Sequence, residues 1–196
     1  MGKIFCLMGK SASGKDTIYK KLLEQADFPL SAIVPCTTRP MRQGETPGLE
    51  YDFYTEEELA ALLKANKVIE LRSYHTIHGI WHYFTADDGR IHLEHNSYLI
   101  IGTLESYQQM QRYFGKETLV PLYISLDDGV RLQRALDRER AQEKPGYAEL
   151  CRRFLADEQD FSEKKLEEAG IRKTFSNVTL SEITEELTEY IKTHLF

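Results

Sequence analysis

The chain has 196 residues, enough for one compact domain with a real hydrophobic core. Its formal net charge of −6 argues against a nucleic-acid partner, because phosphate backbones bind basic surfaces. No apolar run approaches the roughly 20 residues of a membrane-spanning helix. The three cysteines are far apart and lack metal-ligand spacing, which predicts reduced thiols in a cytoplasmic protein.

In the first half of the chain, strand and helix signals alternate. Residues 4–8 are an apolar run typical of a buried strand, and the helical spacing of Ile18, Leu22 and Leu23 follows. Residues 31–36 read as a second strand, and residues 37–50, rich in Thr, Pro, Arg and Gly, read as loop. Thr55 and Glu58 form a predicted capping box that begins another helix.

The second half continues this alternation. Buried strands are predicted at 97–101, 119–126 and 174–178, and charged helices at 127–140 and 148–168. A second capping box, Thr179 to Glu182, begins an amphipathic C-terminal helix. The pattern predicts an α/β fold in one domain, with helices on both faces of a central parallel sheet.

The strongest motif is the segment GKSASGKDT at residues 9–17, between the first strand and the first helix. Its glycines let backbone N–H groups turn inward around a phosphate at the positive end of the helix, and Lys15 can reach the β and γ phosphates. A simple tight turn would not account for Lys15. The predicted nucleotide-binding residues are Gly9, Ser11, Ser13, Gly14, Lys15, Asp16 and Thr17.

Asp16 stands where such loops normally carry a hydroxyl that binds Mg²⁺. A carboxylate is an equally hard oxygen ligand, although its charge also repels phosphate. The favoured interpretation is a working site in which Asp16 and Thr17 serve the metal.

A second motif spans residues 36–54, CTTRPMRQGETPGLEYDFY, with Arg39 and Arg42 three residues apart in a predicted loop. Paired arginines suit a phosphate monoester because each planar guanidinium donates two parallel hydrogen bonds. Taken alone, the stretch fits a solvated loop about as well.

Together, GKSASGKDT and TTRPMRQGETPGLEYDF resemble the guanylate kinases, whose pattern is GPSGxGKST followed by TTRxxRxGExxGxxYxF. The resemblance implies a P-loop kinase fold with a core (1–35 and 91–196), an acceptor-binding lobe (about 36–90) and a helical lid (about 138–153). It implies Mg²⁺-dependent transfer of the ATP γ-phosphate to GMP. The expected assembly is a monomer or homodimer, a choice that the sequence leaves open.

The same resemblance implies roles for individual residues. The acceptor-binding residues would be Thr37, Arg39, Arg42, Tyr51, Glu70, Tyr83 and Thr85, with Glu70 accepting from the N1–H and 2-amino groups of guanine. The catalytic residues would be Lys15, Arg39, Arg134, Arg138 and Arg153, which stabilise charge on the moving phosphoryl group. Arg131 and Arg140 are predicted instead to lie on an exposed helix face in pairs with acidic residues.

Several positions depart from the family pattern. Pro35-Cys36 replaces a small hydroxyl residue before TTR, and Gly102 stands near the place of the family's Asp after the central strand. These changes fall on the acceptor side, so they bear on base specificity. His75, His78 and His82 suggest a metal site by spacing, but Gly79 and the aromatic run after it favour a strand and turn, with the histidines in lobe packing or substrate contact.

Two other functions stay open. The first is a related kinase with another phosphorylated acceptor, such as ribose 1,5-bisphosphate; kinases of that compound resemble guanylate kinases and also carry Asp after the P-loop Lys. The second is an inactive guanylate-kinase-like interaction domain, which the intact Gly9, Gly14 and Lys15 disfavour.

Overall fold

The computed structural model describes residues 1–42, 44–76 and 79–195. Its core is a parallel sheet that, within those residues, has five strands. Their spatial order is β2 (Leu30–Ala32), β7 (Ser97–Ile101), β1 (Ile4–Met8), β8 (Leu119–Ser125) and β9 (Thr174–Ser176). The predicted parallel α/β core is therefore confirmed, and β1, which carries the glycine loop at its carboxyl end, lies at its centre.

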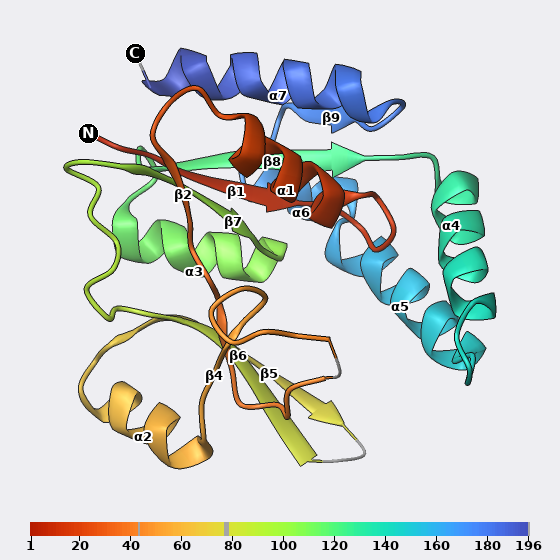
Figure 1. Cartoon of the computed structure of the whole chain (residues 1–196), viewed down its shortest axis with the longest axis horizontal. Helices are drawn as coiled ribbons and strands as arrows, with labels where there is room; N and C mark the ends of the chain where they lie inside the picture. The colour runs from red at the N-terminus through yellow and green to blue at the C-terminus, as the bar shows by residue number, and fades with distance from the viewer. Residues whose placement is uncertain (43, 77–78, 196) are drawn as a thin grey trace.

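Helices cover both faces of this sheet (Figure 1). Phe5 and Leu7 of β1 face α1 (Lys15–Gln25) and α7 (Leu180–Leu195), while Cys6 and Met8 face α3 (Leu104–Phe114). This alternation is the two-residue period of a strand buried on both faces. Both apolar faces of the sheet are thus sealed, and its carboxyl edge carries the loops.

The segment predicted as the acceptor-binding lobe (about 36–90) contains a second, smaller sheet below the core in Figure 1. Its strands, in order, are β4 (Asp52–Phe53), β3 (Cys36–Thr37), β6 (Gly79–Ala86) and β5 (Val68–Thr76), and it packs under α2 (Glu56–Lys64). The capping box predicted for α2 is present, since Thr55 Oγ1 accepts from Glu58 N at 3.1 Å and Thr55 N donates to Glu58 Oε2 at 2.7 Å.

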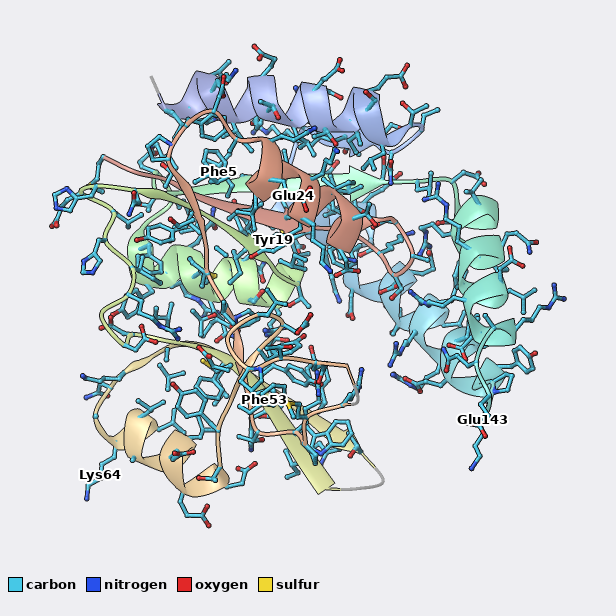
Figure 2. All side chains as sticks on the ribbon, viewed as in Figure 1. Phe5, Tyr19, Glu24, Phe53, Lys64 and Glu143 are labelled. Atoms are coloured by element: carbon cyan, nitrogen blue, oxygen red, sulfur yellow. The ribbon has the colours of Figure 1, made fainter. Side chains whose placement is uncertain are left out.

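The segment predicted as the lid (about 138–153) lies in a helical arm at the right of Figure 1. Helix α4 (Asp128–Arg140) runs out from the core and α5 (Tyr147–Asp160) returns. Glu143, in the connection between them, points away from the body (Figure 2). The predicted lid range 138–153 therefore covers the tip of this arm.

Three predictions of elements need correction. Residues 31–36 do not form one strand: β2 ends at Ala32 and β3 begins at Cys36 in the other sheet. Proline has no N–H, and Pro35 lies where the chain crosses between the sheets. Residues 148–168 do not form one helix, because α5 ends before Phe161 and α6 (Glu163–Glu168) follows. Helix α3 was not predicted at all.

The break after α5 follows from packing. Phe161 is buried and stacks on Tyr123 of β8 with the ring centroids 5.6 Å apart. Burying this ring takes the chain out of the helical path, and Ser162 occupies the N-cap position of α6. None of the helices among the described residues combines the length and the apolar character that a membrane crossing requires.

Candidate functional site: a phosphate-binding loop facing an arginine-lined cavity

The loop between β1 and α1 is held open by its glycines and by a distant side chain. Gly14 has φ 91°, and a Cβ built on it would lie 2.5 Å from Asn177 Nδ2. That amide donates to the Ser13 carbonyl at 2.7 Å. Any larger residue at position 14 would collide with the amide that braces the loop.

The loop has the features of a phosphate cradle. Lys15 opens α1 and its Nζ donates to the Lys10 carbonyl at 3.2 Å, closing the loop. Burial lowers the pKa of Lys15, with Asp16 acting in the opposite direction. Ser13 Oγ is buried and, within the described residues, lacks a hydrogen-bond partner. That these residues bind the polyphosphate of ATP stays a prediction.

Ala12 occupies the loop position where the family pattern has glycine, and its φ is 60°. L-residues pay about 1–2 kcal/mol in this left-handed region, whereas glycine adopts it freely at some cost in chain entropy. We expect Ala12→Gly to raise the free energy of unfolding by about 0.5–1 kcal/mol, measured by urea denaturation. The control is Ala61→Gly at an exposed position of α2, which should lower the free energy of unfolding by about 1 kcal/mol. If both variants lose stability by the same amount, Ala12 is not strained.

Asp16 and Thr17 lie in the first turn of α1 and are exposed. Asp16 borders a cavity of about 500 Å³ between α1 and the acceptor lobe. The rest of its wall includes Tyr19, Ile33, Pro35 and Tyr51 and is mostly apolar. Among the described residues no His, Cys, Asp or Glu cluster of three or more has metal-binding geometry, so a role of Asp16 and Thr17 toward Mg²⁺ stays a prediction.

Arg39 is held in place by other residues of the motif at 36–54. It is 3% exposed and binds both carboxylate oxygens of Glu45, at 2.8 and 2.5 Å. Its Cζ lies 4.9 Å from the ring centroid of Tyr51 and 5.6 Å from that of Phe53. Hydrogen bonds from Arg39 lower the pKa of Glu45 to about 2. The Arg39 Nε is buried and has no partner within the described residues.

Strands β5 and β6 place Glu70, Tyr83 and Thr85, which are predicted to bind the acceptor, on one face of the smaller sheet. Cross-strand pairing places Glu70 opposite Thr85 and Arg72 opposite Tyr83. Thr85 Oγ1 donates to Glu70 Oε1 at 2.9 Å, and the Tyr83 ring lies 5.7 Å from that of Tyr51. Thr37 is also buried, but its hydroxyl donates to the His82 carbonyl at 2.8 Å and so holds β3 to β6.

A cavity of about 390 Å³ joins the glycine loop at 9–17 (the predicted P-loop), the loop at 37–50 (the predicted acceptor loop) and the arm. Ser11, Arg42, Arg138 and Arg153 all line it. Arg153 also pairs with Glu149 at 2.9 Å. Arg134 is not part of this lining, but its Nη1 lies 3.8 Å from the position of a Cβ on Gly14, beside the phosphate loop. Predicted residues from three separate segments therefore converge.

Arg131 corrects the prediction of an exposed helix face. It is 1% exposed, and its guanidinium donates to Asp128, to Glu158 at 2.8 Å and to the Ser11 carbonyl at 3.1 Å. The second carboxylate of α5 continues this contact, because Asp157 Oδ2 accepts from Ser11 N at 2.7 Å. Arg131 thus ties the arm to the P-loop, whereas Arg140 is exposed and paired with Asp137, as predicted.

The glycine at position 102 is explained by the close packing around it. A Cβ there would lie 2.7 Å from Cys6 Sγ and 2.8 Å from Ser106 Oγ. The two polar atoms fill the place that a side chain would need, and Ser106 is itself engaged in the capping box of α3 with Thr103. An acidic residue at position 102 is therefore incompatible with this packing.

We expect Gly102→Ala to lower the free energy of unfolding by about 1–3 kcal/mol through overpacking. Cys6→Ala removes the nearest atom, so the double variant should be more stable than the sum of the two single effects predicts. A double-mutant cycle by urea denaturation measures this coupling. Additive effects would mean that Cys6 is not the obstacle.

Of the three histidines, His82 makes contacts that join β6 to β5 and to α2. His82 Nδ1 lies 2.7 Å from Ser73 Oγ, and its Nε2 lies 3.3 Å from Glu56 Oε2 of α2. His75 is exposed on β5, and His78 lies outside the described residues. The strand part of the interpretation is confirmed by β5 and β6, whereas residues 77–78, between these strands, lie outside the described residues.

Sequence reasoning missed three positioning residues: Arg72, Asn177 and Glu158. Arg72 was findable, since residues 70 and 72 of a strand point to the same face. Asn177 and Glu158 act on the loop at 9–17 from more than 140 positions away, and no local pattern announces such contacts.

Comparison with known proteins finds similarity to guanylate kinases in the first part of the chain. The family model named "Guanylate kinase" matches residues 1–84. The chain is 35% identical to a guanylate kinase of Rhodopirellula baltica over 81 residues, which are 41% of this chain and 38% of that protein. It is 41% identical to one of Nitrobacter winogradskyi over 69 residues, 35% of this chain and 31% of that protein. The aligned part thus spans less than two fifths of these relatives.

The fold comparison extends over the whole chain. A crystal structure of guanylate kinase from Anaplasma phagocytophilum superposes with a TM-score of 0.69 and 18% sequence identity, covering 98% of this chain and 85% of that one. The predicted resemblance to guanylate kinases and the predicted P-loop kinase fold are confirmed.

Proposed function

We propose that the chain is an ATP-dependent nucleoside monophosphate kinase that transfers the γ-phosphoryl group of ATP to GMP. The observation that carries this proposal is the cavity in which Ser11 of the P-loop, Arg42 of the acceptor loop, and Arg138 and Arg153 of the arm meet. Such a site suits the passage of a phosphoryl group between two bound phosphates. A monomer or homodimer in the cytoplasm is part of the same proposal.

Different residues would bind the ATP phosphates, the metal ion and the acceptor phosphate. The loop at 9–17 would hold the ATP phosphates, with Lys15 against the β and γ oxygens, and Asp16 and Thr17 would hold Mg²⁺, which neutralises phosphate charge when bound. Arg39, Arg42, Tyr51 and Tyr83 would hold the acceptor phosphate, with Glu70, Thr37 and Thr85 behind them. No general base is needed when that phosphate is already ionised.

Closure would complete the site. The arm (lid about 138–153) would bring Arg138 and Arg153, with Arg134 at the loop, onto the transferring group, and the lobe (about 36–90) would close over the acceptor. Excluding water favours transfer over hydrolysis. Stabilisation of the spreading negative charge by fixed cations supplies most of the acceleration.

The test is a coupled ADP-release assay with Mg-ATP. GMP, dGMP, AMP, UMP, CMP and ribose 1,5-bisphosphate are offered separately, and a reaction without acceptor measures hydrolysis. Turnover with GMP or dGMP well above that background is expected. Turnover with ribose 1,5-bisphosphate alone would replace the proposal by the related sugar-phosphate kinase, and silence with all acceptors despite ATP binding would refute it in favour of an interaction domain.

A further inference from the structure

The Glu70 carboxylate already has a partner of its own chain. Arg72 Nε donates to Glu70 Oε2 at 2.9 Å and Arg72 Nη2 to Oε1 at 3.2 Å. The Glu70 side chain is 0% exposed and that of Arg72 is 11% exposed. With the Thr85 hydroxyl added at 2.9 Å, three donors converge on this carboxylate.

Arg72 binds the Glu70 carboxylate through two N–H groups, as a guanine base would. A guanidinium presents two parallel N–H groups to a carboxylate, as guanine does with its N1–H and 2-amino groups. Arg72 therefore occupies the edge of Glu70 that guanine would need. Since separating a buried ion pair is strongly unfavourable, a guanine base gains little net free energy by displacing Arg72.

Two positions at which the family pattern carries polar side chains lack them here. Pro35 has neither an N–H nor a polar side chain, and Gly102 has no room for a side chain at all. In the cavity of about 500 Å³ that Asp16 borders, Ile33, Pro35 and Ile101 form an apolar part of the wall. Such a wall gives apolar contact without distinguishing the hydrogen-bonding edges of purines.

We propose that Arg72 sets the acceptor specificity of this chain: by occupying Glu70, it makes the site accept purine nucleoside monophosphates with little regard to the 2-amino group. This inference rests on the proposed function, because it concerns the same acceptor site. GMP and IMP, which differ by that amino group, are then bound almost equally well.

The experiment compares GMP and IMP in the wild type and in Arg72→Ala, by steady-state kinetics and by calorimetric binding without ATP. In the wild type the preference for GMP, in kcat/KM and in Kd, is expected to stay below about tenfold, whereas a site built to bond the extra amino group discriminates by several orders of magnitude. In Arg72→Ala the preference should rise at least about tenfold through tighter GMP binding, with the KM for ATP unchanged. Arg90→Ala, which removes another paired arginine of the lobe, should leave the preference as it is.

The outcomes separate the two proposals. If the wild type phosphorylates neither nucleotide but Arg72→Ala binds GMP more tightly, the specificity role stands and the proposed function falls. If the wild type phosphorylates GMP and the preference is unmoved in folded Arg72→Ala, or GMP binding weakens there, the specificity role falls. Absence of GMP binding in both proteins also overturns it. Should Arg72→Ala fail to fold, the wild-type preference decides alone: above about tenfold refutes the inference.

Discussion

Lys15→Ala is expected to lower kcat for phosphoryl transfer by about 10²–10³-fold, the loss typical for removing one group that stabilises transition-state charge. The Lys15 ammonium stands at the start of α1 inside the loop, and burial lowers its pKa. Lys10, the other lysine of the loop at 9–17, does not take its place, because its Nζ is bound to Glu158 Oε1 at 2.6 Å. The coupled assay with GMP measures the effect.

The control is Lys21→Ala on the same helix, which borders a different hollow near α7 and should leave kcat within about twofold, as a surface change away from the site. Thermal unfolding of both variants checks that the fold is intact. If folded Lys15→Ala retains most of the wild-type kcat, the loop is not the phosphate site.

Arg131→Ala is expected to produce the largest loss of stability. Removing one partner of a buried ion pair costs about 3–5 kcal/mol, and Arg131, at 1% exposed, also lies over the Phe154 ring at 4.8 Å from its centroid. Its carboxylate partners Asp128 and Glu158 are 51% and 37% exposed, so they can turn to water after the change, and the less exposed Asp157 keeps its hydrogen bond from Ser11 N. We therefore expect the lower end, about 3 kcal/mol, by urea denaturation.

Arg140→Ala on the same helix is the matched comparison. Arg140 is 61% exposed and pairs with Asp137 at 3.8 Å; exposed pairs contribute less than about 1 kcal/mol. Similar losses in the two variants would show that the contact of Arg131 with the P-loop adds nothing to stability.

The elements predicted well are those whose signals are local. The capping box of α2 needs only Thr55 and Glu58, and β7 coincides with the apolar run at 97–101. Helix α3 also carried a readable signal, since Leu104, Tyr107 and Met110 recur at a spacing of three and are its buried apolar residues. That helix was missed although the pattern for it was present.

The rest depends on contacts between distant segments. The end of α5 is set by the stacking of Phe161 on Tyr123, and the burial of Arg131 by Ser11, 120 positions earlier. At the candidate site, the residue types and the convergence of Ser11, Arg42, Arg138 and Arg153 followed from the motifs. The occupation of Glu70 by Arg72 did not, because the family pattern assigns that carboxylate to a base.

The central position of β1 has a consequence for how the chain reaches its fold. Its two neighbours, β7 and β8, and the residue that braces the glycine loop, Asn177, all follow residue 84 in the sequence. A nascent chain that ends at residue 84 thus holds every residue matched by the family model, yet its first strand is unpaired on both edges. Such long-range pairing is slow, so we expect the glycine loop to reach its braced conformation only after β9 and Asn177 have been synthesised and have docked.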